Sequence, residues 1–277
     1  MATTSVIETK KNGQSVFSRL FWLFAMIGKG FLNSLAAAGR ITLFAIHGII
    51  HSLTPPFFPR LIARQMLDIG YYSLPVVGMT GIFAGMVLAL QTYTGFSRFA
   101  AEGAVATVVV ISMTRELGPV LAGLMVAGRV GAAVAAEIGT MRVTEQVDAL
   151  STLSTNPFKY LIAPRLIAGI TMLPILVLVA TVIGVMGGYL VSVYKLGFNS
   201  PTYITRTLEF LELQDVISGM VKAAVFGFLV TLMGCYHGYN SQRGAQGVGA
   251  ATTNAVVSAS ILILISNYII TELFFAV

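Results

Sequence analysis

The sequence has few charged residues and a single cysteine. Asp, Glu, Lys and Arg together make up 10% of its 277 residues, and 56% of the residues are hydrophobic. Soluble domains carry about 25% charged residues, so this composition excludes an ordinary soluble domain and indicates an integral membrane protein. With Cys235 as its one cysteine, the chain can form neither an internal disulfide nor a cysteine metal cluster.

The sequence also lacks the motif G-x-x-x-x-G-K-[ST], with which many proteins cradle the phosphates of ATP. Its apolar segments contain no paired His–acid or Ser–Lys constellation at matched depth and no metal motif. The sequence therefore predicts a protein that is not an enzyme and binds no cofactor itself. The net charge of +6 is concentrated at the N-terminus and near helix ends, which favours contact with lipid headgroups over binding of nucleic acid.

Long apolar runs predict an all-α integral membrane protein with five transmembrane helices. We expect a tail and interfacial amphipathic helices over residues 1–57, because Lys29, Asn33, Arg40 and His47 form a polar stripe on a helix otherwise rich in apolar residues. A cleaved signal peptide is the alternative for this region. A transmembrane domain then covers residues 58–277, with spans at about 71–93, 105–136, 161–194, 216–239 and 250–275.

The second span changes character along its length. Small residues recur every four positions in its lower half and predict close packing against another helix; they are Gly123, Ala127, Gly131, Ala135 and Gly139, hereafter the small-residue stripe. Charges then crowd into residues 137–153, so the helix must leave the bilayer there. This segment has an apolar side, formed by Val143, Val147 and Leu150. Its charged residues are Glu137, Arg142, Glu145 and Asp148.

The bias of basic residues places this charged segment in the cytoplasm. We interpret it as a short amphipathic helix that transmits force across an interface; an ordinary cytoplasmic loop is the alternative. A second group of charges lies within the membrane. Arg115 and Glu116 are about 15 Å along the second span, Lys222 has a comparable depth in the fourth, and Asp215 lies two turns above it. Such residues normally face a cavity or a partner, so either a structural salt bridge or a substrate pathway explains them.

Four stretches resemble the MlaE-type permeases of phospholipid-transporting, MCE-associated ABC systems. They are RELGPVL at 115–121, AGRVG at 127–131, AEIGTMRVTEQVDAL at 136–150 and GVGAATTNAVV at 247–257. The resemblance covers about residue 59 to the C-terminus. It implies a permease subunit that moves phospholipid or a related amphiphile between membranes, powered by a separate cytoplasmic ATPase that binds ATP and Mg.

The same resemblance implies a homodimer, a periplasmic lipid-binding protein with an MCE domain, and a place in a bacterial inner membrane or, alternatively, a plastid inner envelope. It makes residues 137–153 the coupling helix that docks on the ATPase, and it favours a substrate-pathway role for the charges in the membrane. A rival hypothesis is an ion-coupled carrier or channel, without an ATPase, that uses a relay of Arg115, Glu116, Asp215 and Lys222.

Overall fold

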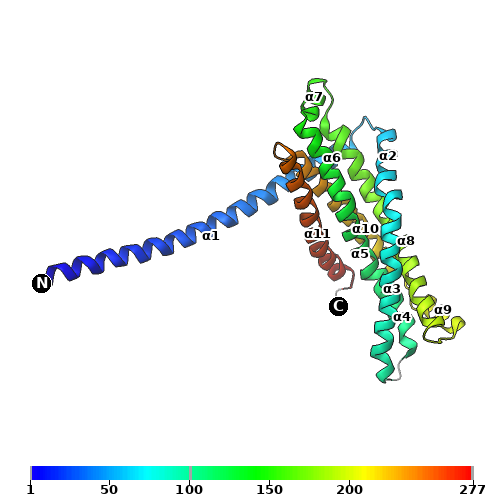
Figure 1. Cartoon of the computed structure of the whole chain (residues 1–277). Helices are drawn as coiled ribbons and strands as arrows, with labels where there is room; N and C mark the ends of the chain where they lie inside the picture. The colour runs from blue at the N-terminus through cyan, green and yellow to red at the C-terminus, as the bar shows by residue number, and fades with distance from the viewer. Residues whose placement is uncertain (1, 100–101, 276–277) are drawn as a thin grey trace. The chain divides into compact units, whose positions relative to one another are not determined.

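The computed structural model describes the backbone of residues 2–99 and 102–275 and, except at 2–21, 23, 24, 27, 34, 99 and 102, their side chains. Throughout these ranges the regular structure is helical (Figure 1), which confirms the predicted all-α class. Contacts divide the chain into two units, the second of which begins at Gly48. The candidate site lies in this second unit.

The first helix, α1, runs without interruption over Ala2–Leu53, where one or two interfacial helices were expected. It ends before the pair Pro55-Pro56, because proline lacks a backbone N–H and disfavours helical geometry in the residue before it. Its part Gly28–Leu53 is long and apolar enough to cross a membrane, which adds a sixth candidate span to the five expected. The interfacial placement of residues 15–53 stays a prediction.

The remaining helices follow the expected order. Each of the five predicted spans lies within one long apolar helical segment: Pro59–Phe96, Val105–Val143, Phe158–Tyr194, Leu213–Tyr239 or Ala245–Phe275. The segments contain, in order, α2 (Pro59–Ile69), η1 (Tyr71–Ser73) and α3 (Leu74–Phe96); α4 (Val105–Ser112), η4 (Met113–Leu117), α5 (Gly118–Val126), η5 (Ala127–Gly131) and α6 (Ala132–Val143); η6 (Phe158–Ile162) and α8 (Ala163–Tyr194); α10 (Leu213–Tyr239); and α11 (Ala245–Phe275).

Shorter elements connect these segments. Between α3 and α4 lie two short turns, η2 (Ser97–Phe99) and η3 (Glu102–Ala104). Helix α7 (Gln146–Thr152) follows α6 at one end of the second unit, and α9 (Ser200–Glu209) follows α8 at the other end (Figure 1).

Helix α8 packs closely against both α3 and α10. A Cβ atom on Gly85 of α3 would collide with the carbonyl oxygen of Gly184 on α8, and a Cβ on Gly227 of α10 would collide with that of Gly169 on α8. Because only glycine leaves room for backbones to approach this closely, these positions fix how the three helices pack.

The small-residue stripe packs against α10 of the same chain. A Cβ on Gly123 would lie 3.1 Å from the ring of Phe226 on α10. In the opposite direction, Cβ atoms on Gly234 and Gly238 of α10 would lie 3.1 and 2.9 Å from the carbonyl oxygens of the stripe residues Gly131 and Ala135. The small residues of both helices therefore face each other, and the long segment Val105–Val143 is closely packed on α10.

Candidate functional site

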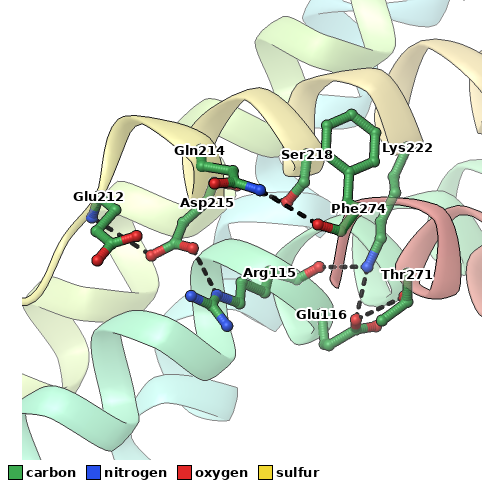
Figure 2. Close-up of polar contacts among 9 residues, drawn as sticks. All are labelled: Arg115, Glu116, Glu212, Gln214, Asp215, Ser218, Lys222, Thr271 and Phe274. Atoms are coloured by element: carbon green, nitrogen blue, oxygen red, sulfur yellow. Dashed lines mark hydrogen bonds and ion pairs between the residues drawn. The ribbon is translucent and has the colours of Figure 1, made fainter. Parts of the chain in front are cut away.

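The four ionisable residues predicted within the membrane come together as two ion pairs (Figure 2). Arg115 and Glu116 belong to η4, and Asp215 and Lys222 belong to α10. Nε of Arg115 lies 2.5 Å from Oδ1 of Asp215, and Nζ of Lys222 lies 2.6 Å from Oε1 of Glu116. We call these four residues the charge cluster; their formal charges cancel.

The backbone around Pro119 explains part of this arrangement. Pro119 has no N–H, so the carbonyl oxygen of Arg115, four residues earlier, loses its helical donor. The N–H of Gly118 donates instead to the carbonyl oxygen of Met113, which makes η4 a π-helical turn. Nζ of Lys222 donates to the freed carbonyl oxygen of Arg115 at 2.8 Å. The π-helical turn before Pro119 thus gives Lys222 a second acceptor.

The members of the charge cluster differ in exposure. Lys222 and Asp215 are fully buried, whereas the side chains of Arg115 and Glu116 are 31% and 38% exposed. A buried charge is costly unless it is paired and hydrogen-bonded, so the two residues of α10 depend on their partners in η4. Arg115 and Glu116 are the members that a ligand can reach.

Helix α11 completes the site with residues that the sequence analysis missed. Glu116 accepts hydrogen bonds from Nδ2 of Asn267 at 2.8 Å and from Oγ1 of Thr271 at 2.9 Å. The ring of Phe275 lies 4.3 Å from Cζ of Arg115. Asn267, Thr271 and Phe275 are spaced by four residues and so share one face of α11. This spacing of two polar residues in an apolar helix was the available signal.

Asp215 takes part in two interactions. Besides holding Nε of Arg115, its Oδ2 accepts from the backbone N–H of Glu212 at 3.3 Å, and the Glu212 side chain reciprocates in a capping box at the start of α10 (Figure 2). This reciprocal bonding satisfies backbone donors at the helix start. Among the described residues, Nη1 and Nη2 of Arg115 have no hydrogen-bond partner. Arg115 therefore has a fixed Nε edge and two available amino groups.

The other predicted group of residues surrounds α7. A single helix over 137–153 was expected, but α6 ends at Val143 and α7 begins at Gln146. Between them Glu145 has φ +60°, a left-handed conformation of the kind that ends helices. Glu137 consequently lies on α6, where its Oε2 is 2.7 Å from Nη2 of Arg165 on α8. Glu137 thus joins two long helices and does not belong to the short one.

The segment 143–150, which joins α6 to α7, has the expected difference between its sides. Val147 is buried, Leu150 and Val143 are half-buried, and Glu145 and Asp148 are exposed. Oδ1 of Asp148 lies 2.5 Å from Nη1 of Arg142. Cζ of Arg142 also lies 5.7 Å from the centre of the Tyr239 ring, which belongs to the last residue of α10. Contacts thus connect α7 through Arg142 to the helix that carries Asp215 and Lys222.

Neither region resembles a metal site. Among the described residues, no group of three or more His, Cys, Asp or Glu side chains is arranged to hold a metal ion. In the charge cluster each carboxylate is already bonded to a cation. The geometry of the cluster is suited to bind a polar or charged group at the amino groups of the partly exposed Arg115 side chain.

Comparisons with known proteins agree with the resemblance found in the sequence. The family model described as Permease MlaE matches residues 62–273. A "Probable ABC transporter permease protein" of Rickettsia bellii is 64% identical over 91% of this chain and 97% of the relative. The "Intermembrane phospholipid transport system permease protein MlaE" of Haemophilus influenzae is 35% identical over 90% of this chain and 96% of the relative. A chloroplastic protein of Arabidopsis thaliana, "TRIGALACTOSYLDIACYLGLYCEROL 1", is 35% identical over 86% of this chain and 66% of the relative.

Proposed function

This chain belongs to the MlaE permease family and is a multi-pass permease of the ABC-transporter class; from that premise we propose that it moves a phospholipid, or a related amphiphile, between membranes. The name of the Haemophilus influenzae relative supports this substrate class. The chain lacks a phosphate-binding loop of the ATPase type. A separate cytoplasmic ABC ATPase, which binds ATP and Mg, therefore supplies the energy.

The observation that carries this proposal is the state of Arg115 in the charge cluster. Asp215 holds its Nε, the ring of Phe275 lies against its guanidinium, and its two amino groups have no partner among the described residues. A guanidinium fixed in this way is suited to bind a phosphate oxygen pair through two parallel hydrogen bonds. We assign headgroup binding to Arg115 and the positioning of the cluster to Asp215 and Lys222.

Glu116 limits what can bind beside Arg115. Its carboxylate accepts from Lys222, Asn267 and Thr271, so most of its acceptor capacity is used. Its negative charge lies next to Arg115 and repels a second anion. The arrangement favours one phosphate with an adjoining cationic or neutral group, as in a zwitterionic or simple phospholipid headgroup, over a multiply charged anion.

The coupling part of the proposal concerns α7. More basic residues lie at the α7 end than at the α9 end, which supports a cytoplasmic position for α7. The first set includes Arg60, Arg64, Arg142, Lys159 and Arg243, the second Arg98, Lys195 and Arg206. The acidic surface of Glu145 and Asp148 would face the ATPase. Since α7 follows directly on the segment that carries Arg115, movement of α7 reaches the charge cluster through one packed helical path.

Two further partners and the location complete the proposal. A second copy of the chain would cover the apolar face of α11, where Val257, Ile261, Leu264, Ile265 and Tyr268 are exposed. A lipid-binding protein with an MCE domain would exchange phospholipid at the α9 end. The bacterial relatives support an inner-membrane location, and the chloroplastic relative keeps the plastid inner envelope as the alternative.

Reconstitution tests this function. The chain and its copurifying ATPase, placed in liposomes, should transfer phospholipid to acceptor vesicles only with ATP. Arg115→Gln should lower the bound phosphorus per purified complex and the transfer rate about tenfold, the loss expected for one charge-assisted contact. Lys195→Gln, which removes an exposed cation after α8, is the matched control and should change neither. Flux through the chain alone, driven by a pH gradient, would instead support the ion-coupled carrier.

A further inference from the structure

A polar cavity lies beside α7, between two parts of the chain about a hundred residues apart. It has a volume of about 310 Å³. One wall is formed by the end of α6 and by α7, through Arg142, Glu145 and Asp148; the other is formed by the connection between α10 and α11, through Ser241, Gln242 and Arg243. We call this cavity the socket and residues 240–244 the α10–α11 loop.

The α10–α11 loop has a defined conformation. The N–H of Ser241 donates to the carbonyl oxygen of Gly238 at 3.2 Å, and that of Val248 donates to the carbonyl oxygen of Gly244 at 3.2 Å. Gly244 has φ +88°, which favours glycine. Oγ of Ser241 donates to the carbonyl oxygen of Gly139 on α6 at 3.4 Å. The loop is thus held against α6 and presents Arg243 at a defined place.

The socket contains two charges that nothing in the described chain neutralises. Arg142 and Asp148 pair with each other at 2.5 Å. Arg243 and Glu145 are both exposed and form no ion pair with any described residue. Charges of opposite sign on opposite walls specify the orientation of whatever enters between them, because the wrong orientation brings like charges together.

Each wall leads to one half of the charge cluster. Helices α7 and α6 continue into the segment that carries Arg115 and Glu116. The α10–α11 loop joins the helix of Asp215 and Lys222 to the helix of Asn267 and Thr271. A partner bound to both walls would therefore move the two halves of the cluster relative to each other. A partner bound to α7 alone would act directly only on the half that contains Arg115 and Glu116.

We propose that the ATPase docks on both walls of the socket, and that Arg243 of the α10–α11 loop contributes as much to ATPase binding as Glu145 and Asp148 do on the other wall. This inference rests on the proposed function, because it names where the ATPase of that function binds. The docking element of the ATPase presents an acidic group to Arg243 and a basic group to Glu145. The sequence predicted docking at residues 137–153 alone and indicated no role for the loop.

The test uses the tagged chain purified with its ATPase and placed in lipid nanodiscs. Arg243→Glu should weaken ATPase binding about tenfold, as expected when attraction across an interface becomes repulsion, and should lower lipid-stimulated ATP hydrolysis at least as much. Arg243→Lys should stay within about twofold of the parent. Arg206→Glu, the same reversal on α9 at the far end of the molecule, is the matched control and should bind the ATPase as the parent does.

A double reversal separates contact with the ATPase from pairing inside the chain. If Arg243 and Glu145 each meet the ATPase, Glu145→Lys combined with Arg243→Glu should bind worse than either single variant. Restored binding in the double variant would mean that they pair with each other, and would overturn the inference. Unchanged binding and ATP hydrolysis in Arg243→Glu would also overturn it while the proposed function stands. A parent chain that retains no ATPase would refute both.

Discussion

The charge cluster and the α7 end use the same chemistry in opposite surroundings. In the cluster Lys222 and Asp215 are fully buried. At the α7 end the side chains of Arg142 and Asp148 are 38% and 60% exposed, although their atoms are as close, at 2.5 Å, as those of the Arg115–Asp215 pair. Distance alone therefore does not distinguish the two regions.

Solvation does distinguish them. An exposed pair contributes about 0–1 kcal/mol, because water stabilises the separated charges nearly as well. A buried charge that loses its partner costs several kcal/mol, since no water replaces that partner. The cluster is therefore built to keep one arrangement of η4, α10 and α11. The α7 end can exchange its intramolecular partners for those of a binding protein at little cost.

The largest effect that this comparison predicts is at Lys222. Lys222→Met leaves the carbonyl oxygen of Arg115 and one oxygen of Glu116 without this donor. It should lower the free energy of unfolding by about 3 kcal/mol, the low end for a broken buried pair because Glu116 is partly exposed. Unfolding in mixed detergent micelles measures this loss. Lys195→Met, an exposed control, should change stability by less than about 0.5 kcal/mol.

A double variant sharpens this prediction. Removing both charges with Lys222→Met and Glu116→Gln should restore much of the stability lost by Lys222→Met alone, because no unpaired charge then remains in the site. The amide oxygen introduced by Glu116→Gln can still accept from Thr271, which donates to the carboxylate of Glu116 in the parent. If the double variant were as unstable as the sum of the two single variants, the Lys222–Glu116 pair would not be the source of the cost.

A smaller effect is expected from the packing between the two regions. Gly227→Ala on α10 places a methyl group against the carbonyl oxygen of Gly169 on α8 and should cost about 2 kcal/mol by overpacking. Gly128→Ala is the matched control, since nothing lies within 4 Å of its Cβ position. It should be neutral or slightly stabilising, because alanine favours the helix over glycine. Equal losses in both variants would contradict close packing at Gly227.

Much of the fold follows from sequence, because the cost of polar backbone in hydrocarbon leaves few alternatives to long apolar helices. The five expected spans are confirmed as candidates. The depth along their helices that the sequence predicts for Arg115 and Lys222 also put these two residues at the same level of the membrane. By contrast, α1 carries two signals for different placements: its polar stripe predicts an interfacial helix, whereas its part Gly28–Leu53 is long and apolar enough to cross a membrane.

The details of the site were harder to predict, for identifiable physical reasons. Pro119 signals the loss of one hydrogen bond, but not that the neighbouring bonds adopt a π-helical register. Asn267 and Thr271 carry no charge, and such residues also occur in membrane helices without a partner. The break before α7 depends on the left-handed conformation of Glu145, which is uncommon for residues other than glycine. Local sequence preferences therefore favour the single helix that was expected.

The smallest effect predicted for stability is at the exposed pair. Arg142→Gln should lower the free energy of unfolding by less than about 1 kcal/mol, although it removes both the 2.5 Å contact with Asp148 and the contact with the Tyr239 ring. Arg142→Gln should nevertheless clearly lower the rate of lipid-stimulated ATP hydrolysis, because Asp148 loses the side chain that positions it for a partner. Unfolding and lipid-stimulated ATP hydrolysis, measured on the same preparation, check both parts. A loss of stability as large as that of Lys222→Met would mean that the α7 end is as rigid as the charge cluster, and the contrast between the two regions would be wrong.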